Sequence, residues 1–257
     1  MLVEVYDVTV DLSGKTGGNI HGKVSLDCMI YQIDLFNRDK ESAHVIQEKL
    51  GSLPLDSPDL APLGYDPGAI IFNLKIDDEE LCKEVITWNP DYVRTNEWLE
   101  KEVQGRNGSV LVTYAVMLEA CLAEVDVKLI QCVQQTTPLR IHGDIVVYIN
   151  DMTYLRYFAF SKKSDNCTII KPLDPIPLSR SLFTCRLGSH LVVKVDLCNS
   201  DTSESLVCGA LLFPLEYYGE FVGTLGDQNK IQVKVNWLFH TKHPKTAEII
   251  NYYSYIK

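Results

Sequence analysis

The sequence predicts an all-β protein made of two tandem antiparallel β-sandwich halves that are related by an internal duplication. The first observation is a repeat: Ile20-His21-Gly22 returns as Ile141-His142-Gly143, an offset of 142 − 21 = 121 residues. The second is that apolar and polar residues alternate along much of the chain, which is typical of antiparallel strands with one buried face. A repeat this long is a duplicated domain, because solenoid units are roughly 20–50 residues long.

Further segments of the first half recur in the second at nearly the same offset. Val3-Glu4-Val5 is matched by Glu124-Val125-Asp126-Val127, and Leu53-Pro54-Leu55 by Ile176-Pro177-Leu178 (177 − 54 = 123). An offset of 121 also places Phe72, Leu74 and Ile76 on Val193, Val195 and Leu197. We therefore predict a first sandwich over 1–133 and a second over 134–257, which together form one family unit.

Strands and turns follow in order along the chain. Alternation predicts strands at 3–10, 71–76, 125–129 and 231–237, and continuous apolar runs at 145–149 and 210–213 predict strands buried on both faces. Turn residues separate them at Gly17-Gly18-Asn19, Asp66-Pro67-Gly68, Arg106-Asn107-Gly108-Ser109 and Gly226-Asp227-Gln228-Asn229. Little helix is expected: two or three turns over 41–50 and one over 96–101. The charged segment 77–106 is interpreted as a long connection peculiar to the first half.

Composition excludes several classes of function. The 257 residues are 46% hydrophobic and 23% charged, with a net charge of −10, as in a globular protein that nucleic acid and anionic membranes repel. No run approaches the roughly 18 apolar residues of a membrane span, and the N-terminus does not resemble a secretory signal. The eight cysteines form no Cys-x-x-Cys pair, which favours small buried thiols in a cytoplasmic or nuclear protein.

The sequence contains no recognisable catalytic or metal-binding constellation. His21 and His142 recur without partners, so the glycine that follows each is interpreted as a structural bend or bulge. His240 and His243 are interpreted as surface residues. Five aspartates lie in predicted loops of the first half, where calcium binding is the alternative to simple solvation: Asp56, Asp59, Asp66, Asp77 and Asp78. We expect no enzyme activity and no cofactor.

An interaction surface is the remaining candidate site. Trp88, Tyr92 and Trp98 lie within the polar segment 77–106, and aromatic residues of these types dominate interface energetics. The alternative is that these side chains cap the open end of the first sandwich.

Several short motifs, none diagnostic alone, resemble a plant domain family of unknown function that is expanded in grasses. They are Leu35-Phe36-Asn37-Arg38-Asp39, the block 53–58, Asp66-Pro67-Gly68 with the strand 71–76, and the pair 114–120 and 123–128. In that family the domain stands alone or follows a ribosome-inactivating rRNA N-glycosidase domain. The resemblance therefore implies an accessory module in a plant stress or defence setting.

The glycosidase activity itself is not expected here. Such enzymes place a glutamate and an arginine three residues apart, and in Glu119-Ala120-Cys121-Leu122 the arginine's position holds Leu122. The leading hypothesis is a non-catalytic sandwich protein that binds protein. The alternatives are a calcium- or lipid-binding module of C2-like character and a diverged partner of an N-glycosidase.

Overall fold

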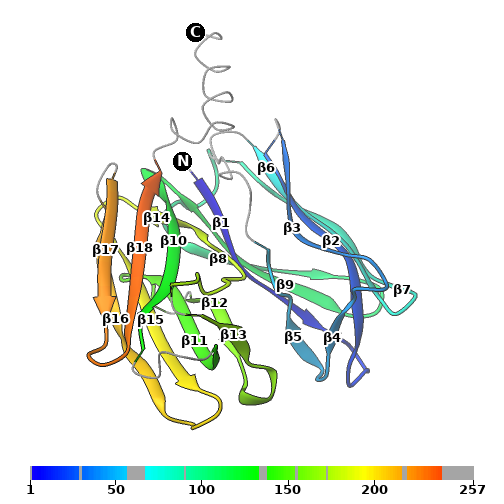
Figure 1. Cartoon of the computed structure of the whole chain (residues 1–257). Coiled ribbons are helices and arrows are strands. Elements are labelled where there is room, and N and C mark those ends of the chain that lie inside the picture. The colour runs from blue at the N-terminus through cyan, green and yellow to red at the C-terminus, as the bar shows by residue number, and fades with distance from the viewer. Residues whose placement is uncertain are drawn as a thin grey trace. The chain divides into compact units, whose positions relative to one another are not determined.

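The strands of the chain form two compact units, Met1–Ala120 and Cys121–Lys257 (Figure 1). The computed structural model describes residues 2–28, 31–56, 67–89, 91–132, 138–153, 156–171, 173–215 and 219–238. Within these residues the only helix is a 3-10 turn at Ser164–Asn166, and the prediction of an all-β fold is confirmed.

The first unit is a sandwich of two antiparallel sheets. One sheet has the order β5-β1-β9-β8 and the other β3-β2-β6-β7, with β4 paired to β2. The strands are β1 (Leu2–Asp11), β2 (Gly18–Asp27), β3 (Gln32–Arg38), β4 (His44–Ile46), β5 (Leu50–Ser52), β6 (Gly68–Ile76), β7 (Glu79–Trp88), β8 (Trp98–Gln104) and β9 (Ser109–Met117). Alternate residues of both sheets meet in one core, which includes Val8, Val24, Phe72 and Val112.

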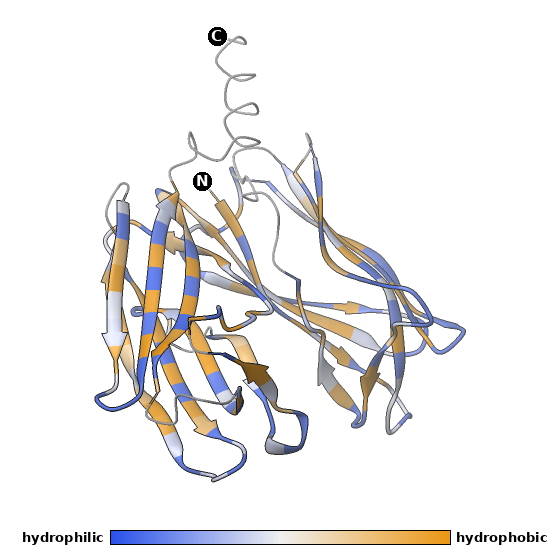
Figure 2. Cartoon of the chain, in the orientation of Figure 1, coloured by the Kyte–Doolittle hydropathy of each residue, from blue (hydrophilic) through white to orange (hydrophobic). Residues whose placement is uncertain are grey.

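The second unit repeats this topology strand for strand. Its sheets have the orders β14-β10-β18-β17 and β12-β11-β15-β16, with β13 paired to β11. The strands are β10 (Ala120–Gln131), β11 (Leu139–Ile149), β12 (Arg156–Lys162), β13 (Thr168–Ile170), β14 (Leu182–Arg186), β15 (His190–Asn199), β16 (Ser205–Pro214), β17 (Gly219–Leu225) and β18 (Lys230–Leu238). Figure 2 shows the alternation of apolar and polar residues along β10 and β18.

The recurring Leu-Pro and Ile-Pro segments occupy the same place in both units. The Leu53 N–H donates to the Val8 carbonyl oxygen at 2.9 Å, and the Ile176 N–H donates to that of Val127 at 2.8 Å. Both side chains are buried. The two segments therefore align with the first strand of their own unit in the same way.

The glycine of each Ile-His-Gly motif is required by the backbone. Gly22 has φ +111° and Gly143 has φ +117°. A Cβ atom would lie 2.2 Å from the Asn73 carbonyl oxygen at the first and 2.1 Å from that of Asp196 at the second. Both strands bulge a few residues later, between Val24 and Ser25 and between Ile145 and Val146. The structural interpretation of the repeated motif is thus confirmed.

Register places the later strands at an offset of 123, not 121. Gly22 pairs with Leu74, and Gly143 pairs with Leu197, so that Leu74 corresponds to Leu197. The sequence alignment of this strand was wrong by two residues, a shift that keeps every side chain on the same face because strand periodicity is two.

Three other expectations were wrong. The segment 41–50 is not helical, because β4 and the start of β5 pair with β2 and β1. Residues 96–101 are not helical either, because β8 pairs with β9 from Trp98 onward. The segment 77–106 is not a connection peculiar to the first half, since it holds β7 and β8, whose counterparts are β16 and β17. In addition, the units divide near Ala120, before the expected boundary at 133, because β10 pairs with β18 of the second unit.

Candidate functional site

The loop 89–97 joins β7 to β8, the edge strands of the two sheets of the first unit. The Asn89 carbonyl oxygen accepts the N–H of Tyr92 at 3.0 Å and that of Val93 at 2.9 Å. At the other end of the loop, the Asn96 N–H donates to the Val116 carbonyl oxygen at 2.8 Å, and its side-chain oxygen accepts the Leu118 N–H at 2.9 Å. The loop is therefore anchored at both ends, which holds Tyr92 in place.

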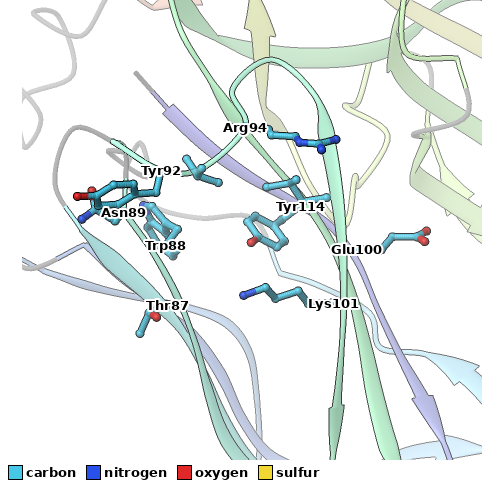
Figure 3. A pocket seen from close by; sticks show the side chains of 10 residues that line it. Thr87, Trp88, Asn89, Tyr92, Arg94, Glu100, Lys101 and Tyr114 are labelled. Atoms are coloured by element: carbon cyan, nitrogen blue, oxygen red, sulfur yellow. The ribbon is translucent and has the colours of Figure 1, made fainter.

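A pocket with a volume of about 330 Å³ lies beneath this loop, between β7 and β8 (Figure 3). It combines aromatic and aliphatic walls with several polar groups. Its lining residues are Thr87, Trp88, Asn89, Tyr92, Val93, Arg94, Leu99, Glu100, Lys101 and Tyr114. The opening exists because β7 and β8 belong to different sheets and pair with each other nowhere along their length.

The three aromatic residues predicted as an interaction surface have different environments. Trp88 is only 3% exposed and forms a wall of the pocket, whereas Tyr92 is 86% exposed on the loop above it. Trp98 is 41% exposed at the start of β8 and does not line the pocket. Of the three, only Trp88 is enclosed as the capping alternative requires, whereas Tyr92 and Trp98 are exposed.

Tyr114, a buried residue of β9, brings a hydroxyl group to the pocket. Its side chain belongs to the core of the first unit and is 2% exposed. Its hydroxyl group forms no hydrogen bond with any residue that the structure describes. Burial raises the pKa of Tyr114, so this hydroxyl stays protonated and acts as a hydrogen-bond donor at neutral pH.

Charged side chains surround the pocket unevenly. In Figure 3 the Lys101 ammonium group extends into the space between β7 and β8 below the Tyr114 hydroxyl, while the Glu100 carboxylate points away. Lys101 forms no ion pair with any described residue. Arg94, within the loop, forms an exposed ion pair with Glu97, 3.7 Å between Nη1 and Oε2. The inner polar groups of the pocket are therefore mainly hydrogen-bond donors.

Sequence reasoning missed Tyr114 and Lys101. The signal that could have found them is the difference between the halves. In the first unit Leu99 pairs with Tyr114 and Lys101 pairs with Val112. In the second unit the equivalent pairs are Phe221 with Val235 and Gly223 with Val233. The second unit thus has valine and glycine where the first has the tyrosine and the lysine.

Of the loop aspartates considered as calcium ligands, Asp56, Asp77 and Asp78 form contacts with neighbouring side chains. Asp56 accepts two hydrogen bonds from the Arg38 guanidinium at 2.8 Å each, which raises the pKa of Arg38. Asp78 pairs with Lys40 at 2.6 Å, and Asp77 accepts from the Asn19 amide at 2.9 Å. Within the described ranges no three His, Cys, Asp or Glu residues come close enough to hold a metal ion. Asp59, Asp66, His240 and His243 lie outside the described residues.

The repeated histidines differ in their contacts. His142 Nδ1 lies 3.0 Å from the Ser200 hydroxyl oxygen, whereas His21 Nδ1 is buried and has no hydrogen-bond partner in the described part of the chain. His21 also lines a second hollow, of about 500 Å³, with Lys40, Glu41, Asp77 and Asp78. Two of the acidic groups there already have partners, since Asp78 pairs with Lys40 and Asp77 accepts from Asn19.

The fold is that of a duplicated β-sandwich protein, and the pocket between β7 and β8 lies in its first unit. The chain belongs to a family described as a domain of unknown function (DUF6598), whose model matches residues 2–235 and so spans both units. No curated protein matches the chain. Among the described residues, no helix has the length and apolar character needed to cross a membrane.

Solved structures give only distant likenesses. The two C2 domains of extended-synaptotagmin 2 with calcium bound share 12% identity, with 92% of this chain and 95% of that chain covered and a TM-score of 0.30. Human GIVD cytosolic phospholipase A2 shares 11% identity over 91% of this chain and 30% of that chain, with a TM-score of 0.26. These scores carry no argument about function.

Proposed function

We propose that the protein is a non-catalytic interaction module that binds a segment of a partner protein at the pocket between β7 and β8. The observation that carries this proposal is Tyr92, an 86% exposed aromatic residue on a loop anchored at both ends beside the pocket. Tyrosine and tryptophan supply much of the binding energy at protein interfaces. A pre-anchored loop also loses little conformational entropy when a partner binds.

Trp98 extends the proposed contact surface along β8. It lies on the outward side of this edge strand, next to Leu99, whose side chain lines the pocket. Because successive residues of a strand face opposite sides, a segment that enters the pocket under Tyr92 would reach Trp98 by passing over the edge of β8.

The test is affinity capture by the full-length chain, compared among three versions of it. The wild type, Tyr92→Ala/Trp98→Ala, and the control Phe158→Ala/Leu212→Ala are used as baits. The control removes two exposed apolar residues of the second unit, 58% and 61% exposed. We expect a specific partner to bind the wild type and control but to lose roughly tenfold or more of its binding to the Tyr92/Trp98 variant.

The captured partner is then purified and titrated against each version by calorimetry, after circular dichroism has shown that each is folded. Equal affinity for all three versions would show that the pocket region is not the interface.

The family resemblance extends the proposal to a plant stress or defence setting beside an rRNA N-glycosidase. Its catalytic chemistry is not expected in this chain, and the local geometry supports that view: Glu119 has φ +48° in a tight turn, and Ala120 to Leu122 begin the strand β10. The purified chain should release no adenine from ribosomes above background, as measured by primer extension across the depurination site. Clear adenine release would contradict the non-catalytic proposal.

A further inference from the structure

We propose that the pocket between β7 and β8 binds an oxyanion, namely a carboxylate or phosphate group on an acidic segment of the partner protein. This inference rests on the function proposed above. The groups that carry this inference are the Tyr114 hydroxyl and the Lys101 ammonium group, both of which face the pocket (Figure 3).

The Tyr114 hydroxyl indicates that the ligand accepts hydrogen bonds. The tyrosine is only 2% exposed, yet its hydroxyl has no partner among the described residues. The hydroxyl is not one of the fully buried atoms that lack a partner, so it is accessible from the pocket and can donate to a ligand acceptor there. The phenol ring packs in the core with Val112 and Val116, so the hydroxyl is fixed in its direction before any ligand arrives.

The Lys101 ammonium group indicates that the ligand is negatively charged. Lys101 is an exposed residue of β8 and forms no ion pair with any described residue, unlike Lys40, which pairs with Asp78. The neighbouring acid, Glu100, also lines the pocket, but its carboxylate and the Lys101 ammonium group extend to opposite sides of the strand (Figure 3). The cation is therefore not neutralised within the pocket.

A carboxylate or phosphate group satisfies both conditions at once. An ionised carboxylate is only an acceptor, so it can receive a hydrogen bond from Tyr114 and another from Lys101 without leaving a donor of its own unpaired. Charge-assisted bonds of this kind are roughly twice as strong as neutral ones. The apolar walls of Trp88, Val93 and Leu99 would contact the aliphatic part of the same side chain.

The overall charge of −10 does not oppose this contact strongly. At physiological ionic strength, charges more than about 8 Å away are largely screened, so the Lys101 ammonium group at the pocket affects an anionic ligand more than the overall charge does.

Comparison of the halves supports the assignment independently. The second unit repeats the sandwich but has Val235 and Gly223 at the positions of Tyr114 and Lys101. A donor pair needed only for the fold would be expected in both copies, since the strands that carry it are equivalent.

The experiment titrates the full-length ¹⁵N-labelled chain with pentapeptides that differ only in their central residue. The peptides are acetylated and amidated, and the central residue is glutamate, phosphoserine, glutamine or lysine. Binding is followed by the indole N–H signal of Trp88, which lines the pocket, assigned by comparison with Trp98→Phe and Trp237→Phe. Acetate and inorganic phosphate are titrated in parallel as free anions.

We expect the glutamate and phosphoserine peptides to shift the Trp88 signal in a saturable way, and the glutamine and lysine peptides to leave it unchanged. Tyr114→Phe, which removes only the hydroxyl oxygen, and Lys101→Gln should each weaken the acidic peptides about tenfold. Lys83→Gln, which removes an exposed cation of β7 outside the pocket, is the matched control and should bind as the wild type does.

Three results would overturn the inference. They are equal binding of the glutamine and glutamate peptides, wild-type affinity in both Tyr114→Phe and Lys101→Gln, and no shift with any acidic peptide. Free acetate or phosphate binding as tightly as the peptides would overturn the partner segment as the source of the anion. The capture experiment with Tyr92 and Trp98 remains a separate test, so failure of the oxyanion chemistry is distinguishable from failure of the proposed interaction.

Discussion

At the scale of single residues, Gly22 and Gly143 are the duplicated positions at which the backbone most strictly requires glycine. Both have positive φ angles, and at both the neighbouring backbone carbonyl lies where a Cβ atom would be. A side chain at either position must therefore overcome two penalties, the strained φ angle and a contact with immovable backbone.

Gly22→Ala and Gly143→Ala should each lower the free energy of unfolding by about 3 kcal/mol, measured by urea denaturation. Gly14→Ala and Gly188→Ala are the matched controls, because these glycines have φ +80° and +82° but nothing within 4 Å of a Cβ atom. The controls should lose only about 1 kcal/mol, the cost of the φ angle alone. Equal losses at all four positions would mean that the backbone contact contributes nothing.

Among the cysteines, Cys167 should react most readily. The Arg140 Nε–H donates to Cys167 Sγ at 3.2 Å, and this hydrogen bond to the thiolate lowers the pKa of Cys167. Burial instead raises the pKa of Cys82 to about 11 and that of Cys185 to about 12. A lower pKa leaves more thiolate at a given pH, and the thiolate is the nucleophile.

Peptide-resolved mass spectrometry of iodoacetamide labelling should therefore find Cys167 modified first at neutral pH, with Cys82 and Cys185 almost unmodified. In Arg140→Gln the pH profile of Cys167 labelling should move to higher pH, because the stabilising donor is lost. The labelling of exposed Cys208 serves as the internal control and should not change. An unshifted Cys167 profile would argue against the Arg140 contact.

At the scale of elements, sequence reasoning missed the edge strands β7 and β8. Central strands such as β6 and β18 alternate clearly and were predicted, because one face of each packs in a core. β7 and β8 lie at sheet edges, where charged residues prevent pairing with other chains. Their charges, among them Glu84 and Glu100, looked like those of a loop.

The candidate site could be predicted only in part. Trp88, Tyr92 and Trp98 were found because aromatic residues stand out in a polar segment. Tyr114 and Lys101 were missed because the local sequence does not show that a core tyrosine of β9 and a lysine of the edge strand β8 line the same pocket. Only the pairing of Leu99 with Tyr114 and of Lys101 with Val112 reveals it.

Within the second unit, Arg180 links β12 to β14, strands of its two different sheets. It is 3% exposed, its Nη1 donates to the Tyr157 hydroxyl oxygen at 3.1 Å, and its Nε donates to the Leu182 carbonyl oxygen at 2.8 Å. Its guanidinium carbon lies 4.4 Å from the Tyr157 ring centroid and 5.7 Å from that of Phe183. This combination depends on a planar guanidinium group, which lysine lacks.

Arg180→Lys should therefore lower the free energy of unfolding by about 2 kcal/mol, measured by urea denaturation. Arg186→Lys is the matched control, since Arg186 forms a partly exposed ion pair with Asp151 at 2.6 Å and pairs of this kind contribute little. A control as destabilised as Arg180→Lys would show that the loss is not specific to the stacked geometry.

At the scale of the whole molecule, the duplication preserves topology while surface and pocket residues diverge. Both units have the same strand order, the same bulge in the second strand and the same proline segment beside the first. The donors of the pocket occur in one copy only. Apolar periodicity survives because any residue of suitable size can fill a core, whereas a binding group is retained only where it is used.

Each unit should also be stabilised by its own core, because every member of the first unit's core cluster lies between Val3 and Val116. Leu74 and Leu197 are equivalent by register, at 0% and 1% exposure, and provide a symmetric pair of changes. Leu74→Ala and Leu197→Ala should each cost about 3 kcal/mol through the lost contacts and the cavity left behind. Hydrogen exchange followed by mass spectrometry should show faster exchange across β1–β9 in Leu74→Ala and across β10–β18 in Leu197→Ala, with the other unit unchanged. Faster exchange throughout the chain in either variant would instead show that the two halves unfold as one cooperative unit, and that the duplicated domains no longer fold separately.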